Sequence, residues 1–204
     1  MTELLSAKNL TVYRGERCLF QKLSFALNDG DSILIQGVNG SGKTSLLRAM
    51  AGLLDLEEGE IHWRGRATIS HRQSFHGELA WFAHRVGFKG DLTLLENLRF
   101  ESALRPTSMQ NLDTVLSRLS LSPLKNLPFR SLSAGQQRRV GLARLLLAEA
   151  RLWLMDEPLT NLDTGGQELV VQLIVDHLHG GGACVIASHQ SIELDSNMQQ
   201  IELQ

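Results

Sequence analysis

The most constraining feature of this sequence is a glycine-rich loop, GVNGSGKT, at residues 37–44. It fits the pattern G-x-x-x-x-G-K-[ST] at every fixed position, and it stands between a strand-like run, SILIQ, and a helix-like run, TSLLRAMAG. Such a loop wraps an anion with backbone N–H groups, and the helix that follows directs its positive end at the same place. The pattern therefore predicts a phosphate-binding loop made by Gly37, Val38, Asn39, Gly40, Ser41, Gly42, Lys43 and Thr44.

Two side chains of this loop and two carboxylates far along the chain suggest the chemistry. Lys43 can bring its charge to the β- and γ-phosphates of a nucleotide, and the hydroxyl of Thr44 can ligate Mg²⁺. The segment LWLMDE, residues 152–157, is a buried-type strand that ends in Asp156 and Glu157. We expect Asp156 to hold the Mg²⁺ shell, partly through water, and Glu157 to polarise an attacking water as a general base. A solvated pair at a strand end is the alternative.

Length and composition restrict the class of protein. The 204 residues suffice for one domain with a sizeable core, and 43% hydrophobic with 21% charged residues is ordinary for a globular chain. A net charge of −2 gives no reason to expect a nucleic-acid ligand. There is no signal-peptide core and no apolar run of membrane-spanning length, which predicts a cytosolic chain. Cys18 and Cys184 are expected to be buried thiols in a reducing compartment.

The order of strand-like and helix-like runs predicts an α/β fold with a parallel sheet. The first quarter holds the strand candidates AKNLTVY, LSFALN and EIHWRG, which suggest an N-terminal antiparallel region. Buried-type strands, RLWLMD and ACVIAS, follow late in the chain. We expect a single domain over 1–204, with a core of 1–84 and 149–204 and a helical subdomain inserted at approximately 85–148.

A helix start at residues 132–136, LSAGQ, completes the set of motifs. Ser133 and Gln136 fit a capping box, and Gly135 allows close approach to the free N–H groups of the first turn, which form an anion site. The alternative is a plain amphipathic helix start. The segment resembles the LSGGQ signature of ATP-binding-cassette (ABC) ATPases, with Ala134 in place of the first glycine.

This resemblance covers nearly the whole chain, because the order of motifs also matches that family. It implies a P-loop NTPase fold that binds ATP and Mg²⁺. It also implies that Tyr13 stacks on adenine, that Asp163 of TNLD crosses to a partner subunit, and that His189 of SHQ hydrogen-bonds the γ-phosphate and holds the water and Glu157 in line. The alternatives are that Tyr13 is an ordinary strand residue, that Asp163 is only a helix N-cap, and that His189 has no functional role at its strand end.

The family also implies an assembly. Its ATPase domains work as head-to-tail homodimers in which Ser133, Ala134, Gly135 and Gln136 of one subunit cover the ATP held by the other. ATP then joins the subunits, and hydrolysis separates them, so that the cycle can drive membrane partners. The short chain, ending soon after His189, is expected to be a peripheral ATPase subunit on the cytoplasmic face of the cell inner membrane.

His84 narrows the resemblance further. In the general family a glutamine that contacts Mg²⁺ or water stands at this point, before the helical insertion. The histidine, the basic loop GFKG and the segment LTLLENL resemble the ATPases of the haem exporters of cytochrome c maturation. Those pair with CcmB- and CcmC-like membrane subunits, with haem or a haem-loaded chaperone as indirect cargo. A small exporter of another cargo, or a soluble ATPase acting on ribosomes or nucleic acid, are the alternatives. The spacing of His62, His71, His76 and His84 does not indicate a set of haem ligands.

Overall fold

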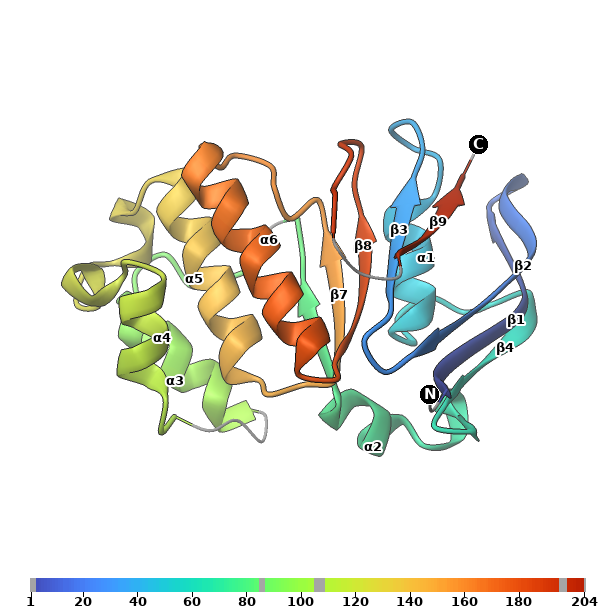
Figure 1. Cartoon of the computed structure of the whole chain (residues 1–204), viewed down its shortest axis with the longest axis horizontal. Coiled ribbons are helices and arrows are strands. Elements are labelled where there is room, and N and C mark those ends of the chain that lie inside the picture. Colours follow the sequence, from blue (N-terminus) through green and yellow to red (C-terminus); the bar gives the residue numbers. More distant parts are fainter. Residues whose placement is uncertain (1–2, 85–86, 105–108, 195–197, 204) are drawn as a thin grey trace.

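The computed structural model describes residues 3–84, 87–104, 109–194 and 198–203, and its strands form two sheets (Figure 1). A four-stranded antiparallel sheet has the order β2-β1-β4-β5, and a five-stranded parallel sheet has the order β6-β7-β8-β3-β9. The first sheet comprises β1 (Glu3–Arg14), β2 (Arg17–Asn28), β4 (Glu58–Trp63) and β5 (Arg66–Ala67). The second comprises β3 (Ser32–Gln36), β6 (Leu79–Phe82), β7 (Leu152–Asp156), β8 (Ala183–Ala187) and β9 (Met198–Glu202). The predicted fold class is confirmed.

The helices cover both faces of the parallel sheet. Helix α1 (Lys43–Met50) lies between the two sheets, and α5 (Ala134–Leu147) and α6 (Thr164–His179) lie on the other side (Figure 1). The remaining helices are α2 (Arg72–Gly77), α3 (Leu94–Leu104) and α4 (Leu112–Arg118), with short 3-10 turns at Thr68–Ser70, Ser122–Leu124 and Phe129–Ser131. No helix in the described ranges is long and apolar enough to cross a membrane.

Alternation along the parallel strands divides the core into two layers. Ile33 and Ile35 of β3 join the cluster that includes α1 and the antiparallel sheet, whereas Leu34 joins the cluster with α5 and α6. Successive side chains of a strand point to opposite faces, so a strand covered on both faces is apolar throughout. All five residues of β7 and of β8 are buried for this reason. The carboxyl ends of these strands are thereby fixed at one edge.

Local signals explain where two elements end. Gly52 has φ +67° and follows α1, and the N–H of Leu53 donates to the carbonyl of Arg48 at 2.8 Å, as in a glycine-terminated helix. At the end of β2, the carboxylate of Asp31 accepts from the backbone N–H of Asn28 at 2.8 Å, which closes the turn between β2 and β3.

The structure departs from the sequence analysis in three places. The sequence from Leu94 to Leu121 has a pattern typical of a continuous helix, but the structure divides it into α3 and α4, and Pro106 lies outside the described residues. The C-terminal strand β9 was not predicted; it pairs in parallel with β3. Cys184 is buried, and burial raises the pKa of its thiol, but Cys18 is exposed because a shift of register between Val12 and Tyr13 turns it outward.

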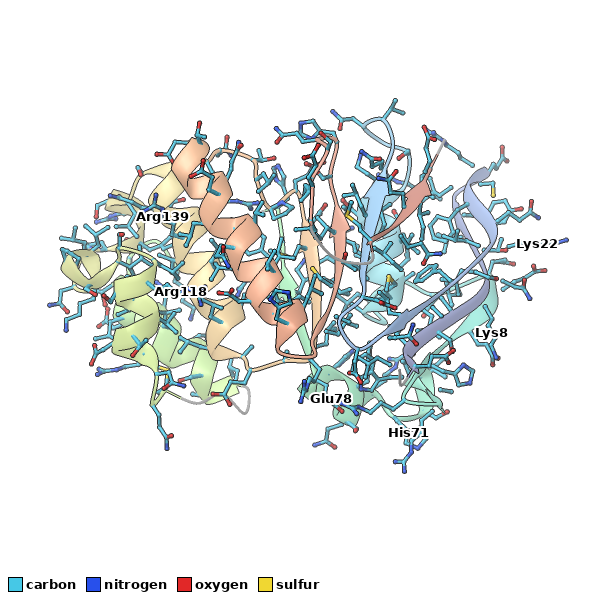
Figure 2. The ribbon with its side chains drawn as sticks, in the orientation of Figure 1. Lys8, Lys22, His71, Glu78, Arg118 and Arg139 are labelled. Carbon is cyan, nitrogen blue, oxygen red and sulfur yellow. The ribbon has the colours of Figure 1, made fainter. Side chains whose placement is uncertain are left out.

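The helices α3, α4 and α5 pack onto the same apolar cluster as one face of the parallel sheet. Leu98 of α3 and Leu116 of α4 belong to this cluster together with Phe82 of β6. At the surface, Arg118 of α4, which Figure 2 labels, forms an ion pair with Asp176 of α6. The division at about residues 85 and 148 stays a prediction.

A half-buried histidine, His177, lies near the C-terminal end of α6. The ring of His177 on α6 stacks on Trp153 of β7 at 3.8 Å between centroids, and its Nε2 lies 3.3 Å from the carbonyl oxygen of Ala183. Burial lowers the pKa of His177 to about 4, against hydrogen bonds to backbone that act in the opposite direction. The neutral ring is therefore the form that fits the folded chain.

We expect His177→Gln to flatten the acid dependence of stability. Between the unfolded-state value of about 6.5 and pH 4, the unfolded chain binds a proton that the folded chain rejects. Stability is therefore fully present above about pH 6.5 and falls by about 3 kcal/mol towards pH 4. Urea titrations over this range measure the slope. His179→Gln, at an exposed neighbour on the same helix, is the matched control and should leave the slope unchanged. An unchanged slope in His177→Gln would exclude this group as the cause.

Candidate active site

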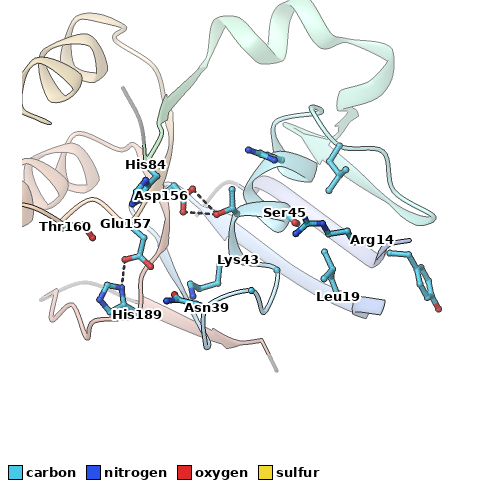
Figure 3. A pocket seen from close by; sticks show the side chains of 16 residues that line it. Arg14, Leu19, Asn39, Lys43, Ser45, His84, Asp156, Glu157, Thr160 and His189 are labelled. Atoms are coloured by element: carbon cyan, nitrogen blue, oxygen red, sulfur yellow. Dashed lines mark hydrogen bonds and ion pairs between the residues drawn. The ribbon is translucent and has the colours of Figure 1, made fainter. Parts of the chain in front are cut away.

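A cleft of about 610 Å³ opens at the edge where β3, β7 and β8 end (Figure 3). In parallel α/β sheets, ligands bind outside the carboxyl ends of the strands. The lining comes from segments widely separated in the sequence and contains both charges and apolar groups. It consists of Tyr13, Arg14, Leu19, Asn39, Gly40, Gly42, Lys43, Thr44, Ser45, Arg48, Leu54, His84, Asp156, Glu157, Thr160 and His189.

The phosphate-binding loop turns from β3 into α1 as the sequence predicts. Gly37, Gly40 and Gly42 have φ values of +149°, +86° and +107°, which a side chain at Cβ would disfavour. Gly42 is the N-cap of α1, so the free N–H groups of the first helical turn face the cleft. Val38 is 72% exposed, whereas Ser41 is buried and its hydroxyl has no hydrogen-bond partner within the described ranges. The loop is thus built to surround an anion.

Lys43 lies folded over this loop. Its Nζ donates to the carbonyl oxygens of Gly37 at 2.6 Å and Val38 at 3.2 Å, and the residue is 7% exposed. Its ammonium group is therefore held at the floor of the cleft, where it can add positive charge to the N–H groups of the loop.

Thr44 and Asp156 meet across the floor, although 112 residues separate them. The Thr44 hydroxyl donates to the two carboxylate oxygens of Asp156 at 2.9 and 3.2 Å. Burial raises the pKa of Asp156, and the Thr44 hydrogen bond and the nearby His84 act in the opposite direction. A hydroxyl and a carboxylate side by side are the hard oxygen donors that Mg²⁺ prefers, so these residues fit that ion.

Glu157 and His189, which both line the cleft, form a hydrogen-bonded pair (Figure 3). Glu157 Oε2 lies 2.7 Å from His189 Nδ1, and the glutamate side chain is 14% exposed against 52% for the histidine. Glu157 also has a left-handed backbone, with φ +50°, which is unusual for a residue other than glycine. A strained backbone at a strand end is a common property of functional sites.

His84 lies in the same cleft, just after the end of β6. It is exposed, and its side chain stands beside Asp156 and Glu157 in Figure 3. Phe88 of the GFKG loop packs edge-on against Phe129 at 5.1 Å, and Asn97 holds this loop by bonds to the N–H and carbonyl of Lys89. Arg85, also part of the predicted basic loop, lies outside the described residues.

The remaining predicted residues divide between cleft and surface. Tyr13 lines the cleft and is 43% exposed. The cleft lining, for the residues that the structure describes, does not include Ser133, Ala134, Gly135, Gln136 or Asp163. The capping box is confirmed: the N–H of Gln136 donates to the Ser133 hydroxyl, and the Gln136 side chain accepts from the Ser133 N–H. Asp163 is the N-cap of α6 and accepts from the N–H of Gly166 at 2.9 Å.

Comparison with known proteins identifies the family to which this fold and cleft belong. Residues 20–160 match the sequence profile of the family described as ABC transporter. The chain belongs to the ABC transporter family. This family binds ATP, which fits the phosphate-binding loop and the adjoining carboxylates.

Relatives within the ABC family are similar over almost their whole length. The cytochrome c biogenesis ATP-binding export protein CcmA of Vibrio parahaemolyticus is 41% identical over 203 residues, covering 98% of this chain and 99% of that protein. The protein of the same name from Yersinia pestis is 43% identical over 190 residues, covering 93% of this chain and 87% of that protein.

Solved ABC structures share the fold. A putative ABC transporter ATP-binding protein from Pyrococcus furiosus superposes with a TM-score of 0.84 at 22% identity, covering 98% of this chain and 96% of that chain. A putative metal-chelate type ABC transporter in an inward-facing conformation gives a TM-score of 0.75 at 28% identity, covering 93% of this chain and 74% of that chain. The predicted P-loop NTPase fold of ABC ATPases is therefore confirmed.

Sequence reasoning missed several residues that line the cleft of this ABC protein. Arg14 follows Tyr13 directly, Ser45 follows Thr44, and Arg48 lies four residues after Thr44 on the same helical face. Their positions next to predicted site residues could have indicated that these three also line the cleft. Thr160 begins the TNLD segment that contains Asp163, whereas Leu19 and Leu54 come from segments with no such signal. The missed residues add positive charge and an apolar wall to the predicted phosphate site.

Proposed function

We propose that this chain is the ATP-hydrolysing subunit of a membrane ABC transporter of the haem-exporter type that acts in cytochrome c biogenesis. The observation that carries the proposal is the 41–43% identity, over 93–98% of the chain, to proteins named as cytochrome c biogenesis ATP-binding export proteins. The site supports it, because the phosphate-binding loop, two strand-end carboxylates and His189 line one cleft.

ATP would lie with its phosphates in the loop of residues 37–44. The loop N–H groups and Lys43 would bind the β- and γ-phosphates, and the exposed ring of Tyr13, which also lines the cleft, would stack on adenine. Thr44 and Asp156 would hold Mg²⁺, partly through water. When bound, this ion would neutralise charge on the phosphate oxygens.

Hydrolysis would depend on Glu157 and His189. Water attacks the γ-phosphorus, its proton passes to Glu157, and the bond from the γ-phosphorus to the oxygen bridging the β- and γ-phosphates breaks. His189 would orient Glu157 through Nδ1 and reach the γ-phosphate through Nε2. A neutral imidazole donates from one nitrogen only, so simultaneous donation to both groups requires the doubly protonated ring.

Two copies of the chain would form the complete site. Ser133, Ala134, Gly135 and Gln136 stand outside the cleft of their own chain, at the N-terminus of α5, where free N–H groups can meet the γ-phosphate held by another copy. Asp163 lies nearby, within 3.9 Å of Arg139 on α5, and would cross between the subunits. This arrangement supports a head-to-tail homodimer closed by ATP.

The membrane partners would be CcmB- and CcmC-like subunits, with the chain bound peripherally on the cytoplasmic face of the inner membrane. The GFKG loop next to His84 is the proposed contact, because Lys89 and the 44%-exposed ring of Phe100 stand together there, 4.2 Å apart. Haem, or a haem-loaded chaperone released on the far side, would be the indirect cargo. The proposal includes no nucleic-acid partner.

Purification from membranes tests this assignment. A tagged chain extracted in mild detergent should bring down integral membrane subunits, and the purified complex should bind added haem. A membrane complex that ignores haem would favour an exporter of another cargo. Recovery of the chain with ribosomes would overturn the exporter assignment.

We expect His84→Gln to keep ATP binding and to reduce the loss of turnover on acidification. Glutamine and neutral imidazole each offer a donor and an acceptor, but only imidazole can become positively charged near neutral pH, beside the proposed Mg²⁺ site. Phosphate release measured from about pH 8 to pH 6 should therefore fall less steeply in the variant. His71→Gln, at an exposed histidine that does not line the cleft, is the control. Identical profiles for wild type and His84→Gln would contradict the proposal.

A further inference from the structure

Arg138, in the second turn of α5, is a buried arginine that reaches two strand ends. It is 5% exposed. Its Nη1 donates to the carbonyl oxygens of Ala83 at 3.0 Å and His84 at 2.9 Å, just beyond β6, and its Nη2 donates to the carbonyl oxygen of Glu157, just beyond β7. The guanidinium also lies 4.3 Å over the ring of Phe82. One side chain thus joins α5 to the exits of two strands that line the cleft.

The backbone of Glu157 is held from both sides. Its N–H donates to the carbonyl of Ala187 at the end of β8 at 2.8 Å, and its carbonyl accepts from Arg138. Between these two bonds the residue has φ +50°, a conformation that is unfavourable for a residue other than glycine. Such a conformation persists only where surrounding contacts impose it. Arg138 supplies one of the two.

Burying the charged guanidinium of an arginine is energetically unfavourable unless its N–H groups make hydrogen bonds that a simpler side chain could not make. Burial lowers the pKa of Arg138 to about 10, while Asp156 and Glu157 act in the opposite direction, so the group remains charged at pH 7. Its Nε is buried without a hydrogen-bond partner among the described residues. A guanidinium offers donors in a rigid planar fork, whereas an ammonium is a point charge on a flexible stem. Only the fork can span carbonyls from two strands at once.

We infer that Arg138 is a positioning residue for Glu157, because it fixes the backbone on which the proposed general base is mounted. This inference rests on the proposed function and deepens it. It also gives α5 a second role: the helix that presents Ser133–Gln136 at its N-terminus holds the Glu157 and His84 carbonyls one turn later. A movement of α5 when the signature turn binds nucleotide would therefore move both carbonyls.

Two substitutions test the role of the fork. Arg138→Met keeps an apolar stem and removes all donors, and Arg138→Lys keeps the charge and loses the fork. We expect kcat for ATP to fall by about 10- to 100-fold in both, with KM changed by less than about threefold, because a small displacement of a catalytic group acts on the chemical step. Arg118→Lys, at the exposed arginine on α4, is the matched control and should keep wild-type values.

A merely structural role would give a different result. It would lower thermal stability and leave kcat per folded, nucleotide-bound molecule unchanged, and this outcome would overturn the inference. In a Glu157→Gln background, Arg138→Met should lower the residual kcat by less than about threefold, since a residue that acts through Glu157 has little left to position. A full additive loss would show that Arg138 acts by another route.

Hydrogen exchange separates this inference from the proposed function. In Arg138→Met and Arg138→Lys, amides of residues 156–160 should exchange faster, and those of β3 should not change. Unchanged exchange at 156–160 would refute the positioning role whatever the turnover. A wild-type chain that binds but does not hydrolyse ATP would refute the proposed function, and the exchange result would still decide the role of Arg138.

Discussion

Glu157→Gln is expected to lower ATP turnover by about 10²- to 10⁴-fold, the usual contribution of a general base. Glutamine keeps the shape of the side chain, and its carbonyl oxygen can still accept the hydrogen bond from His189 Nδ1. What the substitution removes is the capacity to take the proton of the attacking water. Phosphate release at saturating Mg²⁺ and ATP measures the change.

ATP binding provides the comparison for this variant. The Glu157 side chain bonds His189, whereas Lys43, which is proposed to bind the phosphates, bonds the carbonyl oxygens of Gly37 and Val38. The Kd for ATP should therefore stay within about threefold of wild type. Under the proposed scheme, ATP should also hold two Glu157→Gln chains together longer, which light scattering can follow. Glu168→Gln, at an exposed position of α6, is the matched control. Turnover above one third of wild type would remove Glu157 from its assigned role.

The parts of the site that were predictable from the sequence share one property. The residues that bear the chemistry are adjacent in the chain, as in GVNGSGKT, or lie at the end of a buried parallel strand or within two residues of it, as do Asp156, Glu157 and His189. Parallel strands expose their carboxyl ends at the same edge, so side chains after β7 and β8 must meet near the end of β3. Topology therefore converts three separate motifs into one cleft.

The parts that were not predictable depend on packing between distant segments. Leu19 and Leu54 reach the cleft only because the antiparallel sheet packs over α1. The strand β9 had no clear pattern, since Ile201 is the only one of its residues that is buried. Arg138 is one of two successive arginines in QQRRV, which from sequence alone suggests the charged face of a helix, and its carbonyl partners lie 19 to 55 residues away.

The Gly37→Ala substitution should cause the largest loss of stability among single changes in the phosphate-binding loop. A Cβ at this position would lie 2.4 Å from the carbonyl oxygen of Leu203 and 2.5 Å from Ser41 Oγ. The Leu203 oxygen cannot withdraw easily, because the N–H of the same residue donates to the Gln36 carbonyl at 2.8 Å and β9 is paired along β3. The backbone of Gly37 also has φ +149°.

Two contributions to the loss of stability add in the Gly37→Ala variant. The unfavourable backbone conformation contributes about 1–3 kcal/mol, and overpacking against backbone contributes about 1–3 kcal/mol more. We expect the free energy of unfolding, measured in urea without nucleotide, to fall by about 4 kcal/mol, and ATP binding to be lost because the loop N–H groups leave their positions. Gly40→Ala isolates the first term, since Gly40 also has a positive φ, +86°, but its Cβ would meet nothing within 4 Å.

The identity of the clashing group can be tested directly. In a Gly37→Ala chain that ends after Glu202, the Leu203 carbonyl is absent, and the stability lost to overpacking should be partly recovered, although the bond to Gln36 is lost as well. The same truncation in the wild-type background gives the cost of losing that bond together with the buried Leu203 side chain. If Gly37→Ala and Gly40→Ala destabilise equally, the close approach of β9 is not the cause. If truncation rescues only the Gly37→Ala chain, the C-terminal strand is what requires glycine at the first position of the phosphate-binding loop.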